Sequence, residues 1–179
     1  PDAAMDQWMA TDFTRERILN ADATTVSVGH YEGGVYNNYW VLIFSYPENS
    51  HTEDYRQEVL DLVNAQRAKY GLTALEMGDD DLTAAAQTRA EEIAVVNSHV
   101  RPDGSKCFTV LKDYGVTDTP TGENAAWGSV SPEEVVNAWM NSEGHRANIL
   151  NPEARKMSVG YYYNSNSTWG HQWIQIFTK

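Results

Sequence analysis

Apolar residues recur at helical spacing in several stretches of the chain, and the clearest stretch follows Ser131. Ser131 can cap a helix, Pro132 suits its first position, and Glu134 completes a capping box. The apolar side chains then fall three and four positions apart, at Val135, Val136, Trp139 and Met140. This pattern predicts a helix that runs from Ser131 toward the polar run Glu143-Gly144-His145.

The same periodicities predict the other elements of the second half. Helical spacing indicates helices over Glu53–Tyr70 and from Asp79 to about Asn97, and a short helix over Phe108–Tyr114. Alternating aromatic and β-branched residues predict two strands, Met157–Tyr163 and Gln172–Thr178, joined as a hairpin. Three to four helices with a small antiparallel sheet indicate a layered α+β or α-β-α domain.

Part of this pattern occurs twice, at a constant offset of 131 residues. The repeated segments are Trp8-Met9 and Trp139-Met140, Ile18-Leu19-Asn20 and Ile149-Leu150-Asn151, and Ser27-Val28-Gly29 and Ser158-Val159-Gly160. Residues 1–46 therefore read as the C-terminal fragment of a degenerate copy, residues 47–52 as a linker and residues 53–179 as a complete domain.

The fragment predicts a helix around Asp6–Leu19 and a hairpin from Thr24–Tyr31 and Tyr39–Ser45. A lone hairpin with one helix cannot bury its apolar surface in water. We therefore expect residues 5–46 to pack within the chain, with a homodimer contact as a further option. The alternative is that a larger parent protein supplied the missing part of the copy.

Glu143-Gly144-His145 is the first candidate for chemistry. Residues two apart on a helix point to nearly opposite sides, so Glu143 and His145 cannot share a face if the helix continues. Gly144 would let the chain leave helical geometry and aim both side chains at one place. The structural alternative is a polar last turn that ends at the glycine.

Composition and charge narrow the function classes. A net charge of -12 and a pI near 4.7 argue against nucleic-acid or anionic-membrane partners. Cys107 is the single cysteine, so no intrachain disulfide forms, and no apolar run reaches transmembrane length. Because the chain begins Pro1-Asp2, we interpret it as a processed or truncated piece whose targeting signal, if any, has been removed.

Four ordered motifs make residues 51–179 resemble the CAP superfamily, also called SCP-like extracellular domains, in its cysteine-poor bacterial branch. The motifs are Ser98–Gly104, Gly122-Glu123-Asn124, Trp139–Leu150 and the closing hairpin. The resemblance implies an α-β-α sandwich of CAP type with a small antiparallel sheet, here preceded by a helix-hairpin fragment of a second copy. It also implies a large surface cavity lined by four residues, namely His99, Glu123, Glu143 and His145.

The family resemblance further implies that His99 and His145 can hold a divalent metal such as zinc, although no cofactor is required. Two histidines do not amount to a catalytic zinc signature, which normally has three protein ligands. In the structural alternative, Glu123 ties its loop to backbone donors and Glu143 acts as a helix cap. We interpret Cys107 as a buried, inert thiol, and His30 and His171 as structural.

Two functions compete on this evidence. The first is a non-enzymatic module, secreted or on the cell surface, whose cleft binds a small ligand (lipid, sterol, glycan or peptide) or a cell-envelope component. The second is a metal-assisted hydrolase or protease with Glu123 or Glu143 as the general base. We favour the binding module because no catalytic set is complete.

Overall fold

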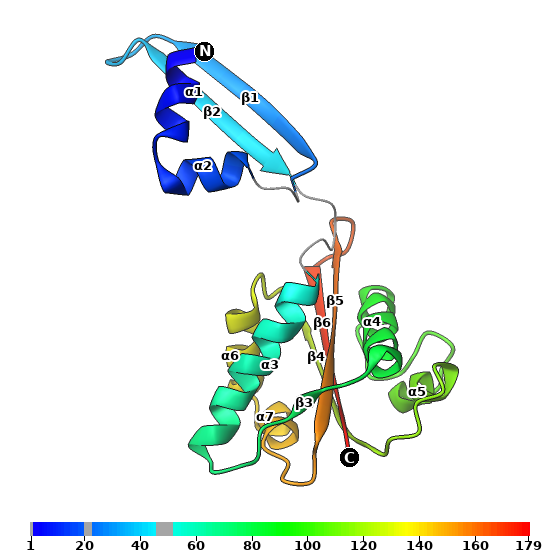
Figure 1. Ribbon diagram of the computed structural model, residues 1–179. Coiled ribbons are helices and arrows are strands. Elements are labelled where there is room, and N and C mark those ends of the chain that lie inside the picture. Colours follow the sequence, from blue (N-terminus) through cyan, green and yellow to red (C-terminus); the bar gives the residue numbers. More distant parts are fainter. Residues whose placement is uncertain (1, 20–22, 46–51) are drawn as a thin grey trace. The chain divides into compact units, whose positions relative to one another are not determined.

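The structure is a computed structural model that describes residues 2–19, 23–45 and 52–179. The chain divides into two compact units, residues 1–50 and 51–179, drawn in Figure 1. The linker predicted over residues 47–52 lies outside the described residues, except for Thr52, which begins the first helix of the second unit.

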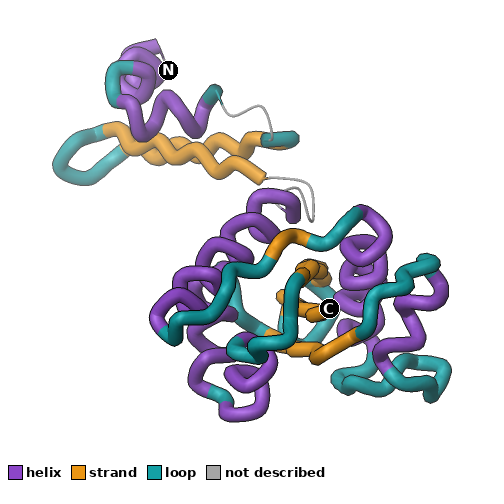
Figure 2. Tube along the Cα trace, turned by 60° about the horizontal axis from the view of Figure 1, so that its bottom comes forward, coloured by secondary structure: helices purple, strands orange, loops and turns teal. Residues whose placement is uncertain are grey.

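The second unit has three layers. Its four-stranded sheet has the order β3-β5-β6-β4, with α3, α6 and α7 on one face and α4 and α5 on the other (Figures 1 and 2). The elements are α3 (Thr52–Lys69), β3 (Glu76–Met77), α4 (Asp80–Val95), a 3-10 turn (Cys107–Thr109), α5 (Val110–Asp113), β4 (Pro120–Trp127), α6 (Pro132–Asn141), α7 (Glu143–Ile149), β5 (Lys156–Asn164) and β6 (Gly170–Thr178). The predicted α+β sandwich is confirmed.

Two strands differ from the prediction of a purely antiparallel hairpin sheet. The short β3 pairs in parallel with β5, so the sheet is mixed. The strand β4, which the sequence pattern did not predict, pairs antiparallel with β6. The alternation of apolar and polar residues does not reveal β4, because Glu123 and Asn124 in its centre are polar but buried.

β4 is an edge strand whose outer side is covered by side chains. Asn148 Nδ2 donates to the carbonyl of Glu123 at 3.2 Å, and Trp139 Nε1 donates to the carbonyl of Ala125 at 3.3 Å. Both donors come from the α6–α7 segment. They satisfy backbone acceptors that a bare sheet edge would leave open to another strand.

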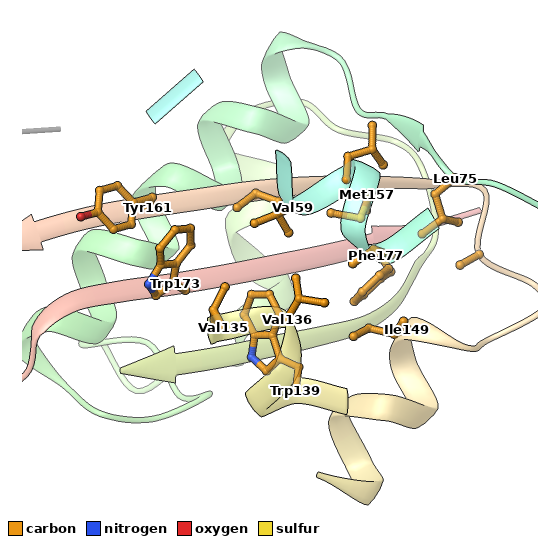
Figure 3. Packing of buried hydrophobic residues seen from close by; sticks show 14 residues of the cluster. Val59, Leu75, Val135, Val136, Trp139, Ile149, Met157, Tyr161, Trp173 and Phe177 are labelled. Atoms are coloured by element: carbon orange, nitrogen blue, oxygen red, sulfur yellow. The ribbon is translucent and has the colours of Figure 1, made fainter. Parts of the chain in front are cut away.

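The core consists of one cluster on each face of the sheet. Figure 3 shows the cluster under α3 and α6, which includes Trp139, Trp173 and Phe177. On the opposite face α4 packs against the sheet with small residues. The strand residue beneath it must be glycine, because a Cβ at Gly160 would overlap the carbonyl oxygen of Ala86. A helix rich in alanine and a glycine in the strand thus bring two backbones into contact.

The helix break before His145 lies at Ser142. Ser142 has φ −100° and ψ 125° and separates α6 from α7, whereas Gly144 lies inside α7. Both sequence interpretations of Gly144, as the break and as the stop, are therefore wrong. The extended backbone at Ser142 redirects the chain without needing a glycine.

The first unit contains two helices and a hairpin. They are α1 (Asp2–Met9), α2 (Asp12–Ile18), β1 (Thr25–Glu32) and β2 (Asn38–Ser45). The predicted hairpin is confirmed, but the single helix over Asp6–Leu19 is wrong. The chain turns between Met9 and Asp12, where the extended backbone of Thr11 (φ −109°, ψ 133°) precedes the second helix.

Candidate functional site

Glu123 is a carboxylate removed from water and held by a buried arginine. Its side chain is 1% exposed, and that of Arg89 on α4 is 0% exposed. Arg89 Nε donates to Glu123 Oε2 at 3.0 Å, and Arg89 Nη2 reaches Oε1 at 3.3 Å. The two-pronged contact is the geometry that suits guanidinium and carboxylate.

The same carboxylate orients His99. Glu123 Oε1 lies 2.7 Å from His99 Nδ1, while the His99 side chain remains 53% exposed. Because an ionised carboxylate only accepts, Nδ1 carries the proton of this bond and Nε2 points away from it. A buried ion pair thus fixes the ring of a histidine that solvent and ligands can reach.

Further charged groups hold the loop that carries His99. Arg89 also donates to Glu92 at 2.6 Å and to the carbonyl of Ser98 at 3.1 Å. Arg101 donates to Glu92 at 2.7 Å and to Asp113 at 2.7 Å. These contacts connect the end of α4 to the His99 loop and to α5.

The pKa shifts in this network follow from its contacts. Burial lowers the pKa of Arg89, but the hydrogen bonds that it donates to Glu123 and Glu92 outweigh this effect and the pKa is raised. Burial raises the pKa of Glu92, and the hydrogen bonds from Arg101 and Arg89 reverse this, so the pKa is lowered. The contacts therefore stabilise the charged forms of Arg89 and Glu92.

The sequence interpretation missed Arg89 and Glu92. Arg89 falls among Ala85, Ala86, Ala90 and Ile93, the apolar face of the predicted helix. A lone arginine on such a face requires a buried acidic partner. This requirement could have indicated from the sequence that Arg89 forms a buried ion pair. The partner itself comes from β4, 34 residues away.

His145 lies near His99 but has the opposite shift. The hydrogen bond with Glu123 raises the pKa of His99, and partial burial opposes it without cancelling it. Partial burial, and then the charge of His99, lower the pKa of His145. Such coupling requires the two rings to be within electrostatic reach of each other.

α7, which carries His145, is tied to β4 by two amides. Asn124 Nδ2 donates to the carbonyl of His145 at 3.1 Å, and Asn148 Nδ2 donates to Asn124 Oδ1 at 2.8 Å. A Cβ at Gly122 would come within 2.6 Å of Asn148 Oδ1, which explains the glycine there. The Gly122-Glu123-Asn124 motif therefore serves both histidines.

Glu143 is the fourth residue predicted for the site. It is exposed at the start of α7, and within the described part of the chain it has no hydrogen bond or ion pair with His99, Glu123 or His145. Because α7 is helical through both positions, Glu143 and His145 point to different sides. Hydrogen bonds thus join Glu123 to His99 and Asn124 to the backbone of His145, and the place of Glu143 in the site stays a prediction.

The comparisons with known proteins match this architecture. The model of the CAP family, described as the cysteine-rich secretory protein family, matches residues 60–177. The chain belongs to the CAP family. The Bacillus subtilis protein YkwD is 41% identical over 127 residues, which cover 70% of this chain and 49% of YkwD.

Solved CAP structures are similar as well. An extracellular SCP-domain protein from Bacillus anthracis has a TM-score of 0.64 and 25% identity, covering 78% of this chain and 47% of that one. An outer surface protein of Borrelia burgdorferi shares the fold with a TM-score of 0.64 and 23% identity, covering 74% of this chain and 96% of that one. The chain spans about half the length of YkwD and of the Bacillus anthracis protein.

The described residues do not fit a metal centre with three protein ligands. Residues 2–19, 23–45 and 52–179 contain no group of three or more His, Cys, Asp or Glu placed to hold an ion. Glu123 is occupied by Arg89 and His99, which leaves the two imidazoles as donors. Any metal at this CAP site would be held by His99 and His145 with water as the remaining ligands.

The remaining candidate residues have structural partners. Burial and the charge of Glu123 raise the pKa of the half-buried Cys107 thiol to about 11, so it stays protonated at neutral pH. His171 Nδ1 lies 2.8 Å from the Tyr161 hydroxyl. A cavity of about 230 Å³ at the end of α4 is lined by residues other than His99, Glu123, Glu143 and His145.

No helix within the described residues combines the length and the apolar character needed to cross a membrane.

Proposed function

We propose that this CAP domain is an extracellular, non-enzymatic binding module whose ligand contacts His99 and His145 beside the edge of β4. The observation that carries the proposal is the hydrogen-bonded series from buried Arg89 through Glu123 to exposed His99. Buried charges are costly unless they are paired. Their use here to orient one accessible imidazole supports a role in binding.

The two histidines offer complementary chemistry to a ligand. The raised pKa of His99 favours its cationic form, and the lowered pKa of His145 favours the neutral form. Together they suit a small ligand that presents an oxygen acceptor, such as the head group of a lipid, a sterol hydroxyl, a glycan or a peptide carbonyl. The extracellular SCP-domain relative supports a location outside the cell.

A divalent metal is the second ligand class that the pair suits. Zinc or nickel would need both imidazoles neutral, and the raised pKa of His99 makes protons strong competitors there. We therefore expect weak metal binding that is lost at a higher pH than the ordinary histidine value of about 6.5 would suggest.

Metal-assisted hydrolysis has less support. A general base must reach the water from which it takes a proton. Glu123 is buried and engaged by Arg89 and His99, and within the described residues Glu143 makes no hydrogen bond or ion pair with either histidine. No contact of these two carboxylates therefore favours proton transfer from water beside the imidazoles.

Native mass spectrometry of the purified chain tests the binding proposal. We expect a co-purifying small molecule that is lost in His99→Ala and in His145→Ala, and calorimetric zinc binding weakened at least about tenfold in both variants. His171→Ala is the matched control, because that histidine is hydrogen-bonded to Tyr161. Zinc and small-molecule binding unchanged in the double variant His99→Ala/His145→Ala would refute the site. Chelator-sensitive turnover of a peptide library, abolished by Glu143→Gln, would favour the hydrolase.

A further inference from the structure

The first unit repeats the contacts of the α6–α7 segment. Moving α2 (Asp12–Ile18) by 131 positions gives the bounds of α7 (Glu143–Ile149). Arg15 Nη1 donates to the carbonyl of Met9 at 3.1 Å, and Arg146 Nη1 donates to the carbonyl of Met140 at 3.0 Å. The same bond thus links the helices of each pair at positions 131 apart.

The two hairpins also share their register. The pairs Ser27↔Ile43, Gly29↔Val41 and His30↔Trp40 of β1 and β2 correspond to Ser158↔Ile176, Gly160↔Ile174 and Tyr161↔Trp173 of β5 and β6. A one-residue slip in either hairpin would exchange its two faces. Each side chain of the first hairpin therefore faces the same way as its counterpart in the second.

In the second unit further elements pack on the edges and faces of this hairpin, and two of them concern β6 and Gly160. β4 pairs with the edge of β6 that β5 leaves free. α4 crosses the face that contains Gly160, whose missing Cβ makes room for the carbonyl oxygen of Ala86. β4 thus covers the edge of β6, and α4 covers the face of Gly160.

The corresponding surfaces of the first unit are exposed. Within residues 2–19 and 23–45, β2 pairs with β1 alone. On the face of Gly29, Val41 is 55% exposed and Ile43 is 63% exposed. A strand with apolar residues on both faces is typical of the interior of a sheet, not of its edge.

Gly29 is the most specific of these features. A Cβ at Gly29 would meet one atom within 4 Å, Cβ of Val41 at 3.9 Å, and the backbone of Gly29 does not require a glycine. A glycine within a strand weakens it and often marks a close approach of another backbone. Its counterpart Gly160 is where α4 makes that approach.

The other face of the hairpin has a hollow where α3 would be expected. A cavity of about 280 Å³ lies between the helices and β2, with Trp8, Ile18, Trp40 and Phe44 among its lining residues. Their counterparts Trp139, Ile149, Trp173 and Phe177 pack with Val59 and Val63 of α3. Within its described residues, the first unit thus has counterparts of α6 and α7 but none of α3, α4 or β4.

We propose that residues 2–45 are a docking module for a polypeptide segment of the α3–α4–β4 kind, supplied from outside these 179 residues. Its strand pairs with β2, and its alanine-faced helix crosses the sheet at Gly29. Residues 52–127 of a second copy do not fit this role, because their own unit already uses them. Pairing of two β2 edges would join strands but would leave Gly29 without a helix.

A tethered segment tests the proposal. Residues 52–131 are placed directly before residue 1 of the full chain, so that the 131-residue offset continues through the junction. Hydrogen exchange of the β2 amides should then slow at least about tenfold, because their outward groups gain partners and the unit gains a core. Gly29→Val should abolish the protection, and Thr25→Val, on the same face near the strand end, should keep it. Equal exchange in the extended and original chains would overturn the proposal.

The original chain supplies two independent checks. Gly29→Val should leave the first unit as stable as before or more stable, since nothing within its own residues needs that space. A destabilised first unit would show that Gly29 serves its own fold, against the proposal. Sedimentation should show no association through β2. A dimer that Ile43→Lys dissolves would assign the surface to a second copy instead.

Discussion

Removing the charge of Arg89 should destabilise the CAP unit strongly through Glu123. Arg89→Met deletes two hydrogen bonds to a carboxylate that is 1% exposed and leaves it with His99 as its remaining charged partner. Breaking a buried ion pair in this way costs about 3–5 kcal/mol. Glu92, the other carboxylate bound by Arg89, keeps its hydrogen bond from Arg101. We therefore assign most of the loss to Glu123 and expect Arg89→Met to lower the free energy of unfolding by about 3 kcal/mol.

A double-mutant cycle isolates that interaction. Glu123→Gln alone should cost about 1–3 kcal/mol, and the double variant Arg89→Met/Glu123→Gln should cost less than the sum by about 1–3 kcal/mol. Urea unfolding followed by tryptophan fluorescence measures each free energy of unfolding. Arg67→Met is the matched control, because Arg67 is equally buried but donates to the carbonyls of Thr73, Ile149 and Asn151.

The control variant should combine additively with Glu123→Gln. Two results would refute the reasoning. One is a cost of Arg89→Met below about 1 kcal/mol, which would mean that Glu123 does not depend on the guanidinium. The other is additivity in the Arg89–Glu123 cycle, which would mean that the two groups do not interact.

Three further predictions follow from the structure. Gly160→Ala should destabilise the unit by about 3 kcal/mol or more, because the new Cβ overlaps the backbone of α4, and a cost below about 1 kcal/mol in urea unfolding would contradict that packing. In metal-free protein, NMR should show His99 titrating above the ordinary pKa of about 6.5 and His145 below it. The stabilisation of the folded unit by His99 is full below pH 6.5 and is lost as pH rises through its raised pKa. The stabilisation by His145 is present above pH 6.5 and is lost as pH falls through its lowered pKa. Titration in the reverse order would refute the assigned contacts. Deleting residues 1–50 should leave a folded CAP unit with the His99–Glu123 bond, and an insoluble or unfolded product would show that both units fold as one.

Local pattern was sufficient for most elements of the CAP unit. The capping box at Ser131 and the apolar spacing that follows it begin α6, and the alternation in the last strands sets the closing hairpin. These elements are decided by neighbours in sequence, because helical and strand periodicities place apolar residues on one face. The motifs around His99, Glu123 and His145 were also visible in the sequence.

Other features depended on partners distant in sequence. β4 looks irregular by itself, because its central Glu123 and Asn124 are polar. Both become buried only because Arg89 and His99 bind the carboxylate, while Gln175 and Asn148 bind the amide. Periodicity counts apolar residues and cannot detect a strand that is stabilised by satisfied polar groups.

The helix break shows the same limit at a smaller scale. Glycine is the residue that usually permits a departure from helical geometry, so Gly144 was the natural expectation. Ser142 instead takes an extended conformation that any residue can adopt, and Asn124 and Asn148 hold α7 against β4. The sequence by itself determined which segments form helices and strands and which motifs carry the histidines. Only the tertiary structure decided that Arg89 belongs to the site and that Glu123 is a buried partner of both Arg89 and His99, because burial and pairing depend on contacts across the fold.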